Sequence, residues 1–360
     1  MKVAPVLRAI GEAQAPFEPV LVHTGQHYSP ELSDVFFEQL GIRAPDVHLE
    51  VGSGGHGQQT ARVLEAFENF LLSAAAAGGP MAATVVVGDV NSTIAAALAS
   101  AKLQVPVIHL EAGLRSFDRR MPEEINRLAT DAISDLLLVS EPAGEVNLKN
   151  EGVPESRVRY VGNVMIDTLV RHLAEAPPAV RGDGKPFALV TLHRPSNVDA
   201  VESLRGIVEF LADLSKEIPV VFPAHPRTQG KLNEFGLMRA LSGTAVEIIA
   251  PQGYLQNLGL MRAAALVLTD SGGIQEETSY LGIPCLTMRE NTERPCTVSG
   301  GTNTLVGQDF GKARGLAKDI LAGRYKKGGA IRGWDGRAAH RVVEAIGEFL
   351  ESRRCCTAVS

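Results

Sequence analysis

Short apolar runs alternate with amphipathic helical patterns along most of the chain, and this alternation constrains the fold more than any other feature. Repeated strand–helix units are typical of a parallel sheet covered by helices. A hydrophobic content of 45% with only 5% aromatic residues fits such a sheet better than an all-β sandwich. The expected strands are Val20–His23, Thr84–Val87, Val105–Ile108 and Leu136–Val139 in the first half, and Phe187–Thr191, Val220–Phe222, Val246–Ile249, Leu266–Leu268 and Cys285–Thr287 in the second.

The length of 360 residues and the two sets of strands predict an α/β protein with two doubly wound, Rossmann-like domains. The join is expected between residues 161 and 185, where several glycines and a proline pair interrupt any continuous core. We therefore predict an amino-terminal domain over residues 1–165 and a carboxy-terminal domain over residues 166–337. A final amphipathic helix over residues 338–352 is expected to pack back on the first domain.

The composition argues against several classes of protein. A formal charge of -6 provides no basic field for nucleic acid, so any anion must be held by a local cluster. No apolar stretch reaches the roughly 18 uncharged residues of a membrane span, and the start lacks the layout of a signal peptide. We therefore expect a cytoplasmic protein without a nucleic-acid or membrane partner. The four cysteines have neither zinc-ligand nor disulfide-framework spacing: Cys285, Cys296, Cys355 and Cys356.

A dense group of ionisable side chains follows one predicted strand, between His109 and Arg127. Ligands of open α/β sheets bind beyond the carboxyl ends of the strands, so Glu111, Arg115 and Glu123 are expected to face one crevice. Such a crevice can hold an anionic substrate and supply a carboxylate that carries a proton. The alternative is a solvated loop in which the acids and arginines pair with each other.

Asp89 follows another predicted strand and precedes small polar residues that suit a helix start. It is either a helix cap or a third carboxylate at the same edge of the sheet. Together with Glu111 and Glu123 it would form an acidic wall. Such a wall suits acid/base chemistry on the sugar or acyl part of a nucleotide conjugate.

The second half carries a different kind of site. Ser271, Gly272 and Gly273 lie between a strand and a helix, where backbone N–H groups can approach a phosphate, and Glu277 lies where it can accept ribose hydroxyls. The alternative for the Ser-Gly-Gly turn is a plain helix cap. Two histidines, His193 and His225, each end a predicted strand of this half and have an arginine within two residues. They either bind a phosphate or transfer a proton, or they have only a structural role.

Taken together, the motifs resemble those of the non-hydrolysing UDP-N-acetylglucosamine 2-epimerases. The resemblance spans Lys2 to about Phe349. It implies a glycosyltransferase-B type architecture of two Rossmann-like domains, with the active site in the interdomain cleft. The matching motifs are Thr24-Gly-Gln-His27, Gly88-Asp89, His109-Leu-Glu-Ala-Gly-Leu-Arg115, Met121-Pro-Glu-Glu-Ile-Asn-Arg127, Gly162-Asn-Val-Met-Ile-Asp167, His193-Arg-Pro195, Asp270-Ser-Gly-Gly-Ile-Gln-Glu-Glu277 and Arg289-Glu-Asn-Thr-Glu-Arg-Pro295.

The resemblance implies reversible epimerisation at C2 that converts UDP-GlcNAc to UDP-ManNAc by elimination and re-addition of UDP, with no metal and no cofactor. Which carboxylate removes which proton stays open. The implied catalytic residues are Asp89, Glu111, Glu123 and His193. The implied substrate-binding residues are Arg115, His225, Ser271, Gly272, Gly273, Glu277 and Arg294, and the residues of a regulatory second site are Gln26, His27 and Arg62.

The resemblance further implies a homodimer that supplies ManNAc units for surface polysaccharide. Relatives carry a first strand and a Gly-x-Arg-Pro loop ahead of the segment matching Met1–Pro5, and we expect this sequence to lack both. Four alternatives stay open. They are a 2-epimerase for a diacetamido-uronic acid conjugate of UDP, a hydrolysing epimerase, a glycosyltransferase of the same fold, and an inactive, truncated nucleotide-sugar binding protein.

Overall fold

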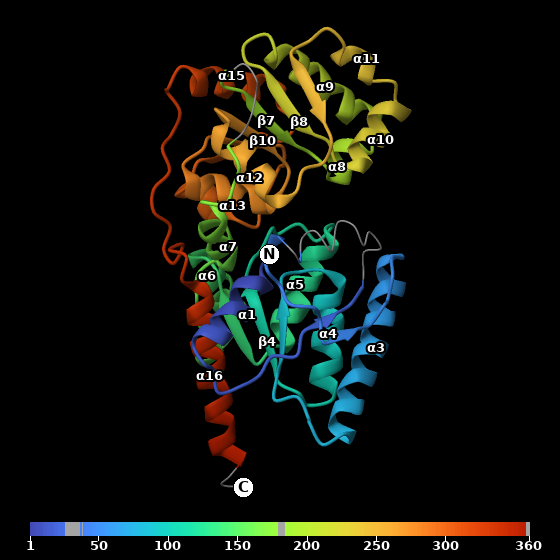
Figure 1. Ribbon diagram of the computed structural model, residues 1–360, viewed down its shortest axis with the longest axis vertical. Coiled ribbons are helices and arrows are strands. Elements are labelled where there is room, and N and C mark those ends of the chain that lie inside the picture. Colours follow the sequence, from blue (N-terminus) through green and yellow to red (C-terminus); the bar gives the residue numbers. More distant parts are fainter. Residues whose placement is uncertain (26–36, 38, 179–183, 358–360) are drawn as a thin grey trace. The chain divides into compact units, whose positions relative to one another are not determined.

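Parallel strands alternate with helices in the computed structural model, as the sequence pattern predicts (Figure 1). The structure describes residues 1–25, 37, 39–178 and 184–357. The chain forms two compact units, of which the first comprises Met1–Val170 with Arg332–Ser360 and the second comprises Arg171–Ile331. Both units are α/β with parallel pairing, which confirms the predicted fold class. Among the described residues, no helix combines the length and the apolar character needed to cross a membrane.

The first unit holds a four-stranded parallel sheet in the order β3-β4-β5-β6 and a two-stranded parallel sheet of β1 and β2. Helices α1 and α16 pack against one face of the larger sheet, and α3 and α4 pack against the other (Figure 1). The elements of this unit are α1 (Val3–Glu12), β1 (Val22–His23), β2 (Val47–His48), α3 (His56–Ala76), β3 (Thr84–Val87), α4 (Asn91–Lys102), β4 (Val107–Ala112), α5 (Pro122–Ile133), β5 (Leu136–Val139), α6 (Pro142–Asn150), the 3-10 helix η1 (Glu155–Arg157), β6 (Val158–Tyr160) and α16 (Ala338–Thr357). Helix α7 (Val164–His172) crosses into the second unit.

The second unit holds a six-stranded parallel sheet in the order β12-β11-β10-β7-β8-β9. Its core is formed by the apolar faces of β7, β8 and β10 and of the covering helices α9 and α15. The elements are β7 (Ala188–Thr191), α8 (Pro195–Val198), α9 (Val201–Leu214), β8 (Val220–Pro223), α10 (Pro226–Glu234), α11 (Met238–Leu241), β9 (Val246–Ile249), α12 (Tyr254–Ala263), β10 (Leu266–Thr269), α13 (Gly272–Leu281), β11 (Cys285–Thr287), α14 (Pro295–Ser299), β12 (Asn303–Leu305) and α15 (Phe310–Leu321).

Five predicted strands differ in their bounds from the structure, and the predicted strand Val105–Ile108 differs most. The apolar run Val105–Ile108 is continued by polar residues, yet β4 runs from Val107 to Ala112 and all of its residues are buried. The strand tolerates His109 because the imidazole contacts Asp131 and the Gly88 carbonyl at 2.6 and 2.8 Å. The short strands β2, β6 and β12 were not predicted, because each is only two or three residues long.

Candidate active site

The carboxyl edge of the first sheet brings Asp89 and Glu111 together. Asp89 follows β3, and Glu111 lies near the end of β4, at a bulge where the pairing register with β5 shifts. Glu111 has a φ of 71°, a left-handed conformation that is strained for a residue other than glycine and is typical of functional sites. Its buried carboxylate forms an ion pair with the ammonium of Lys2, at the start of α1. Sequence reasoning missed Lys2, because a lone lysine ahead of a helix carries no signal.

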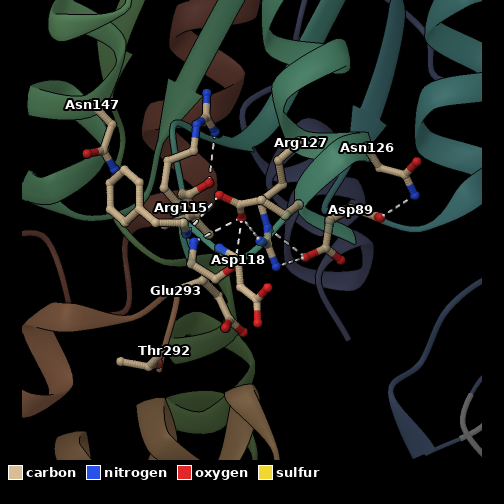
Figure 2. Close-up of polar contacts among 12 residues, drawn as sticks. Asp89, Arg115, Asp118, Asn126, Arg127, Asn147, Thr292 and Glu293 are labelled. Carbon is tan, nitrogen blue, oxygen red and sulfur yellow. Dashed lines mark hydrogen bonds and ion pairs between the residues drawn. The ribbon is translucent and has the colours of Figure 1, made fainter. Parts of the chain in front are cut away.

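Arg127 fixes the Asp89 carboxylate. Its Nε and Nη2 donate to Asp89 Oδ2 at 3.0 and 2.7 Å, while Asn126 Nδ2 donates to the Asp89 backbone carbonyl at 2.9 Å (Figure 2). Helix α4 begins with Val90 as its N-cap and has no side-chain cap. Asp89 is therefore not a helix cap, and α5 holds it at the edge of the sheet.

Two adjacent glutamates at the start of α5 have different environments. Glu124 is buried and accepts hydrogen bonds from Ser116 N and Oγ and from Phe117 N, each at 2.9 Å. It also pairs with Arg127 at 2.5 Å. Glu123 is half-buried, and in the part of the chain that the structure describes nothing is paired with its carboxylate. Glu124 therefore shapes the loop, whereas Glu123 is available to a substrate.

Arg115 lies in a buried network beneath this edge. Its guanidinium contacts Asp131 at 2.7 Å and Glu151 at 2.6 Å, and its side chain is 1% exposed. Asp131 also contacts His109 and accepts a hydrogen bond from Gly113 N at 3.0 Å. Burial alone would raise the pKa of Asp131, but His109 and Arg115 outweigh burial and lower it. These contacts support a positioning role for Arg115, whose assignment to the substrate stays a prediction.

The predicted phosphate-binding turn lies at the amino end of α13 in the second unit. Ser271 occupies the N-cap position without a side-chain cap bond, so its hydroxyl is not used to cap the helix. A Cβ at Gly272 would lie 2.8 Å from Oε1 of the buried Glu293, so a larger residue here would have to displace this carboxylate. The first turn of α13 thus presents backbone N–H groups at a helix amino end, which favours an anion.

His193 and His225 lie close together near this turn, with ring centroids 5.9 Å apart. The side chain of His193 is 45% exposed, and its Nδ1 lies 3.2 Å from Asp270 Oδ1. Burial alone would raise the pKa of Asp270, but hydrogen bonds from His193, Asn197 and the Arg194 N–H outweigh it and lower that pKa. Asp270 therefore orients the His193 imidazole, which remains accessible to a ligand.

Glu277 is buried one turn further into α13, and Tyr254 Oη donates to its Oε1 at 3.0 Å. Burial raises the pKa of Glu277 to about 7, against the lowering effect of the Tyr254 hydrogen bond. Tyr254 is a second residue that sequence reasoning missed. Arg294 is also buried, and its Nε lies 2.6 Å from Glu276, so its assignment to the nucleotide stays a prediction.

Of the three residues predicted to form a regulatory site, the structure describes only Arg62. Gln26 and His27 lie outside the described residues, and Arg62 is exposed on α3, so this site also stays a prediction. Within the described ranges, no group of three or more His, Cys, Asp or Glu side chains is arranged to hold a metal ion.

Proteins of known structure share this fold. The UDP-GlcNAc 2-epimerase of Methanocaldococcus jannaschii, solved in complex with UDP-GlcNAc and UDP, has a TM-score of 0.85 and 40% identity, over 96% of this chain and 95% of that one. The UDP-GlcNAc 2-epimerase of Neisseria meningitidis bound to UDP-GlcNAc has a TM-score of 0.83 and 28% identity, over 96% and 95%. The class is therefore that of α/β enzymes with parallel, Rossmann-like sheets.

The family follows from the sequence comparisons. The family model described as UDP-N-acetylglucosamine 2-epimerase matches residues 9–347, and the chain belongs to this family. A similar relative is the UDP-2,3-diacetamido-2,3-dideoxy-D-glucuronate 2-epimerase of Pseudomonas aeruginosa, which is 41% identical over 97% of this chain and 96% of its own length.

Proposed function

We propose that this chain is a non-hydrolysing epimerase that interconverts UDP-GlcNAc and UDP-ManNAc by inverting C2 of the sugar. The observation that carries the proposal is the group of carboxylates at the carboxyl edge of the first sheet, in a chain of this family. Two of them are held by cations, Glu111 by Lys2 and Asp89 by Arg127, while Glu123 is available to carry a proton.

The reaction needs two proton transfers at C2 and the breaking and re-forming of one bond at C1. A carboxylate removes the C2 proton, the C–H electron pair forms the C1–C2 double bond, and UDP leaves with the electrons of the C1–O bond. The 2-acetamidoglucal that results is attacked at C1 by the diphosphate oxygen, while a proton is delivered to the opposite face of C2. Carboxylates on rigid elements suit both transfers, and their assignment to the two faces stays open.

The second unit supplies groups suited to the UDP part. The amino end of α13, with Ser271 and Gly272, suits a phosphate, and Glu277 suits the ribose hydroxyls. His193 is accessible and oriented by Asp270, so it suits the diphosphate that leaves and returns. The groups of the second unit therefore suit binding of UDP, and the carboxylates of the first unit suit proton transfer.

A second candidate substrate is a UDP-linked diacetamido-uronate. It is favoured by the 41% identity to the P. aeruginosa enzyme. Two relatives described as UDP-N-acetylglucosamine 2-epimerases have no higher identity to this chain, at 41% and 40%. The two candidates share the chemistry at C2 and differ in the groups at C3 and C6. The same assay on both sugars therefore separates them.

The test is incubation of the chain with UDP-GlcNAc in heavy water without an acceptor sugar. We expect deuterium at C2 of both UDP-sugars, with UDP still attached. Release of free UDP and ManNAc would indicate a hydrolysing enzyme. Exchange only with the diacetamido-uronate would indicate the second substrate, and no exchange with either sugar would contradict epimerase activity. A homodimer and a cytoplasmic location stay predictions, which light scattering and cell fractionation would check.

A further inference from the structure

Two sheet edges in the first unit face one apolar cavity. Among the described residues, β3 pairs with β4 alone and β1 pairs with β2 alone, so each lies at the edge of its own sheet. A cavity of about 410 Å³ is lined by residues of both strands, Val20–Thr24 on one side and Thr84–Val87 on the other. We call this cavity the β1–β3 slot.

The backbone groups at the slot are directed for strand pairing. In a parallel strand, the N–H and C=O groups of successive residues point to opposite edges. The N–H of Thr84 donates to the carbonyl of Pro106, just before β4, at 2.8 Å, and the N–H of Gly88 donates to the carbonyl of Leu110, within β4, at 3.0 Å. The intervening Val85 therefore directs its N–H and C=O away from β4 and toward the slot. The carbonyls of Leu21 and His23 accept hydrogen bonds from N–H groups on the β2 side. By the same alternation, the N–H and C=O groups of Val22 point toward the slot.

Apolar helices cover both faces of the slot, as they cover both faces of a strand inside a parallel sheet. Val87 packs in the cluster formed by α1 and α16, whereas Val86 packs in the cluster formed by α3 and α4. Because successive side chains of a strand point to opposite faces, these clusters cover opposite faces of the sheet. Both clusters supply lining residues, namely Val6, Ile10 and Ile346 from one and Phe67, Leu71 and Ala96 from the other.

Two valines have an exposure that is unusual for their place in the fold. Val85, in the middle of a strand, is 42% exposed, and Val20, just before β1, is 45% exposed. Both line the slot. An apolar ligand without a backbone would cover these side chains but would leave the strand N–H and C=O groups without protein partners. An extended polypeptide with apolar side chains on both faces would satisfy the side chains and the backbone together.

We propose that the β1–β3 slot binds an extended apolar peptide as an added strand, parallel to β3. About five residues match the length of an ordinary strand. This binding site is separate from the chemistry at C2, and its test does not depend on epimerase activity.

The experiment uses the 360-residue chain and a fluorescent synthetic peptide of about five Val and Ile residues flanked by lysines. We expect saturable binding by fluorescence anisotropy. We also expect slower amide hydrogen exchange at Val85 and Val22, because strand pairing would protect their N–H groups. A peptide with proline at its central position removes a donor and should bind at least tenfold more weakly.

Two matched protein variants test the location. Val85→Lys places a charge in the slot at a side chain that is already partly exposed, and it should weaken peptide binding at least tenfold. Val146→Lys makes the same change at a 57% exposed valine on α6, away from the slot, and should leave binding unchanged. Equal binding by both variants, no binding by the wild-type chain, or binding without protection of Val85 would each overturn the proposal.

Discussion

Asp131 connects several groups around the first site. Its carboxylate contacts the imidazole of His109, the guanidinium of Arg115 and the N–H of Gly113, which lie on either side of the strained Glu111. A left-handed non-glycine residue costs of order 1–3 kcal/mol and persists only where its surroundings fix it. Asp131 therefore acts through other residues and positions Glu111.

We predict that Asp131→Asn lowers kcat about tenfold or more with little change in KM. The same change should lower the free energy of unfolding by about 3–5 kcal/mol, because it breaks a buried ion pair. Because folding lowers the pKa of Asp131, its contribution to stability is present above about pH 4 and is lost as the pH falls further. Urea unfolding at pH 7 and pH 3 with steady-state kinetics would check this. Asp213→Asn, at an exposed pair, is the control. A variant with normal kcat would remove the positioning role.

The three candidate acid/base residues are tested directly. Asp89→Asn, Glu111→Gln and Glu123→Gln should each lower turnover by roughly a hundredfold or more, the usual effect of losing a positioned acid or base. The matched control is Glu145→Gln, at a partly exposed pair with Arg332. The measurement is kcat for epimerisation together with deuterium exchange at C2. Near-normal exchange in any variant would exclude that residue from the acid/base set.

Glu277 gives a prediction of pH dependence. Its pKa is raised to about 7, above the roughly 4.3 of an unfolded chain, so its ionised form is penalised in the fold. Stability is therefore unaffected by Glu277 below about pH 4 and falls as the pH rises through 7. If the ionised form accepts the ribose hydroxyls, UDP affinity should increase between pH 6 and pH 8.

The measurement is calorimetric titration with UDP at pH 6, 7 and 8. The terminal phosphate of UDP also ionises near pH 6, so the comparison is with Glu277→Gln, in which only the phosphate titrates. We expect the ratio of the two affinities to increase up to about tenfold over this range. A constant ratio would mean that Glu277 does not titrate in contact with the ribose.

At the scale of elements, the amino end of α13 carries the phosphate prediction. Gly272→Ala places a Cβ 2.8 Å from Oε1 of Glu293, a carboxylate that pairs with Arg289 at 2.7 Å. The added methyl group would displace this carboxylate and would stand beside the first N–H groups of α13. We predict that this change weakens UDP binding about tenfold or more, because a phosphate at a helix amino end depends on close backbone approach. Calorimetric titration is the measurement. The matched control is Gly230→Ala on α10, where an added Cβ meets nothing within 4 Å. Unchanged affinity for Gly272→Ala would mean that this turn only starts the helix.

Strands that are mostly apolar could be predicted from the sequence, whereas the polar end of β4 could not. The bounds of β3, β5, β9 and β11 equal the predicted ranges. The end of β4 was missed because His109 and Glu111 depend on partners 22 and 109 residues away in the chain, Asp131 and Lys2. A local pattern holds no information on such partners. Asp89, Glu111 and Glu123 were selected from the sequence because they lie next to apolar runs, whereas Tyr254 and Lys2 have no such signal.

At the scale of the whole molecule, the first unit has two separate sheets with a cavity between their edges, while the second unit has one continuous sheet. A strand in the β1–β3 slot would join the edges and bury apolar surface on two faces. Lys2 lies beside Gly88, at the carboxyl end of β3. An added strand that is fused to Met1 and runs parallel to β3 would therefore end beside Lys2, close to the point of fusion.

We predict that fusing an apolar strand of about five residues to Met1 through a short glycine-serine loop raises the melting temperature by about 5 °C or more. Covalent linkage makes the added strand an intramolecular ligand at high effective concentration, so it should stabilise more than the free peptide. A few kcal/mol is a large fraction of a domain stability of about 5–15 kcal/mol. Calorimetry would compare this chain with one that carries a glycine-serine extension of equal length and one that carries the apolar strand after Ser360. Only the first should melt higher, because only there does the strand end beside Lys2. Equal melting temperatures in all three would show that the edges of β1 and β3 are satisfied without an added strand.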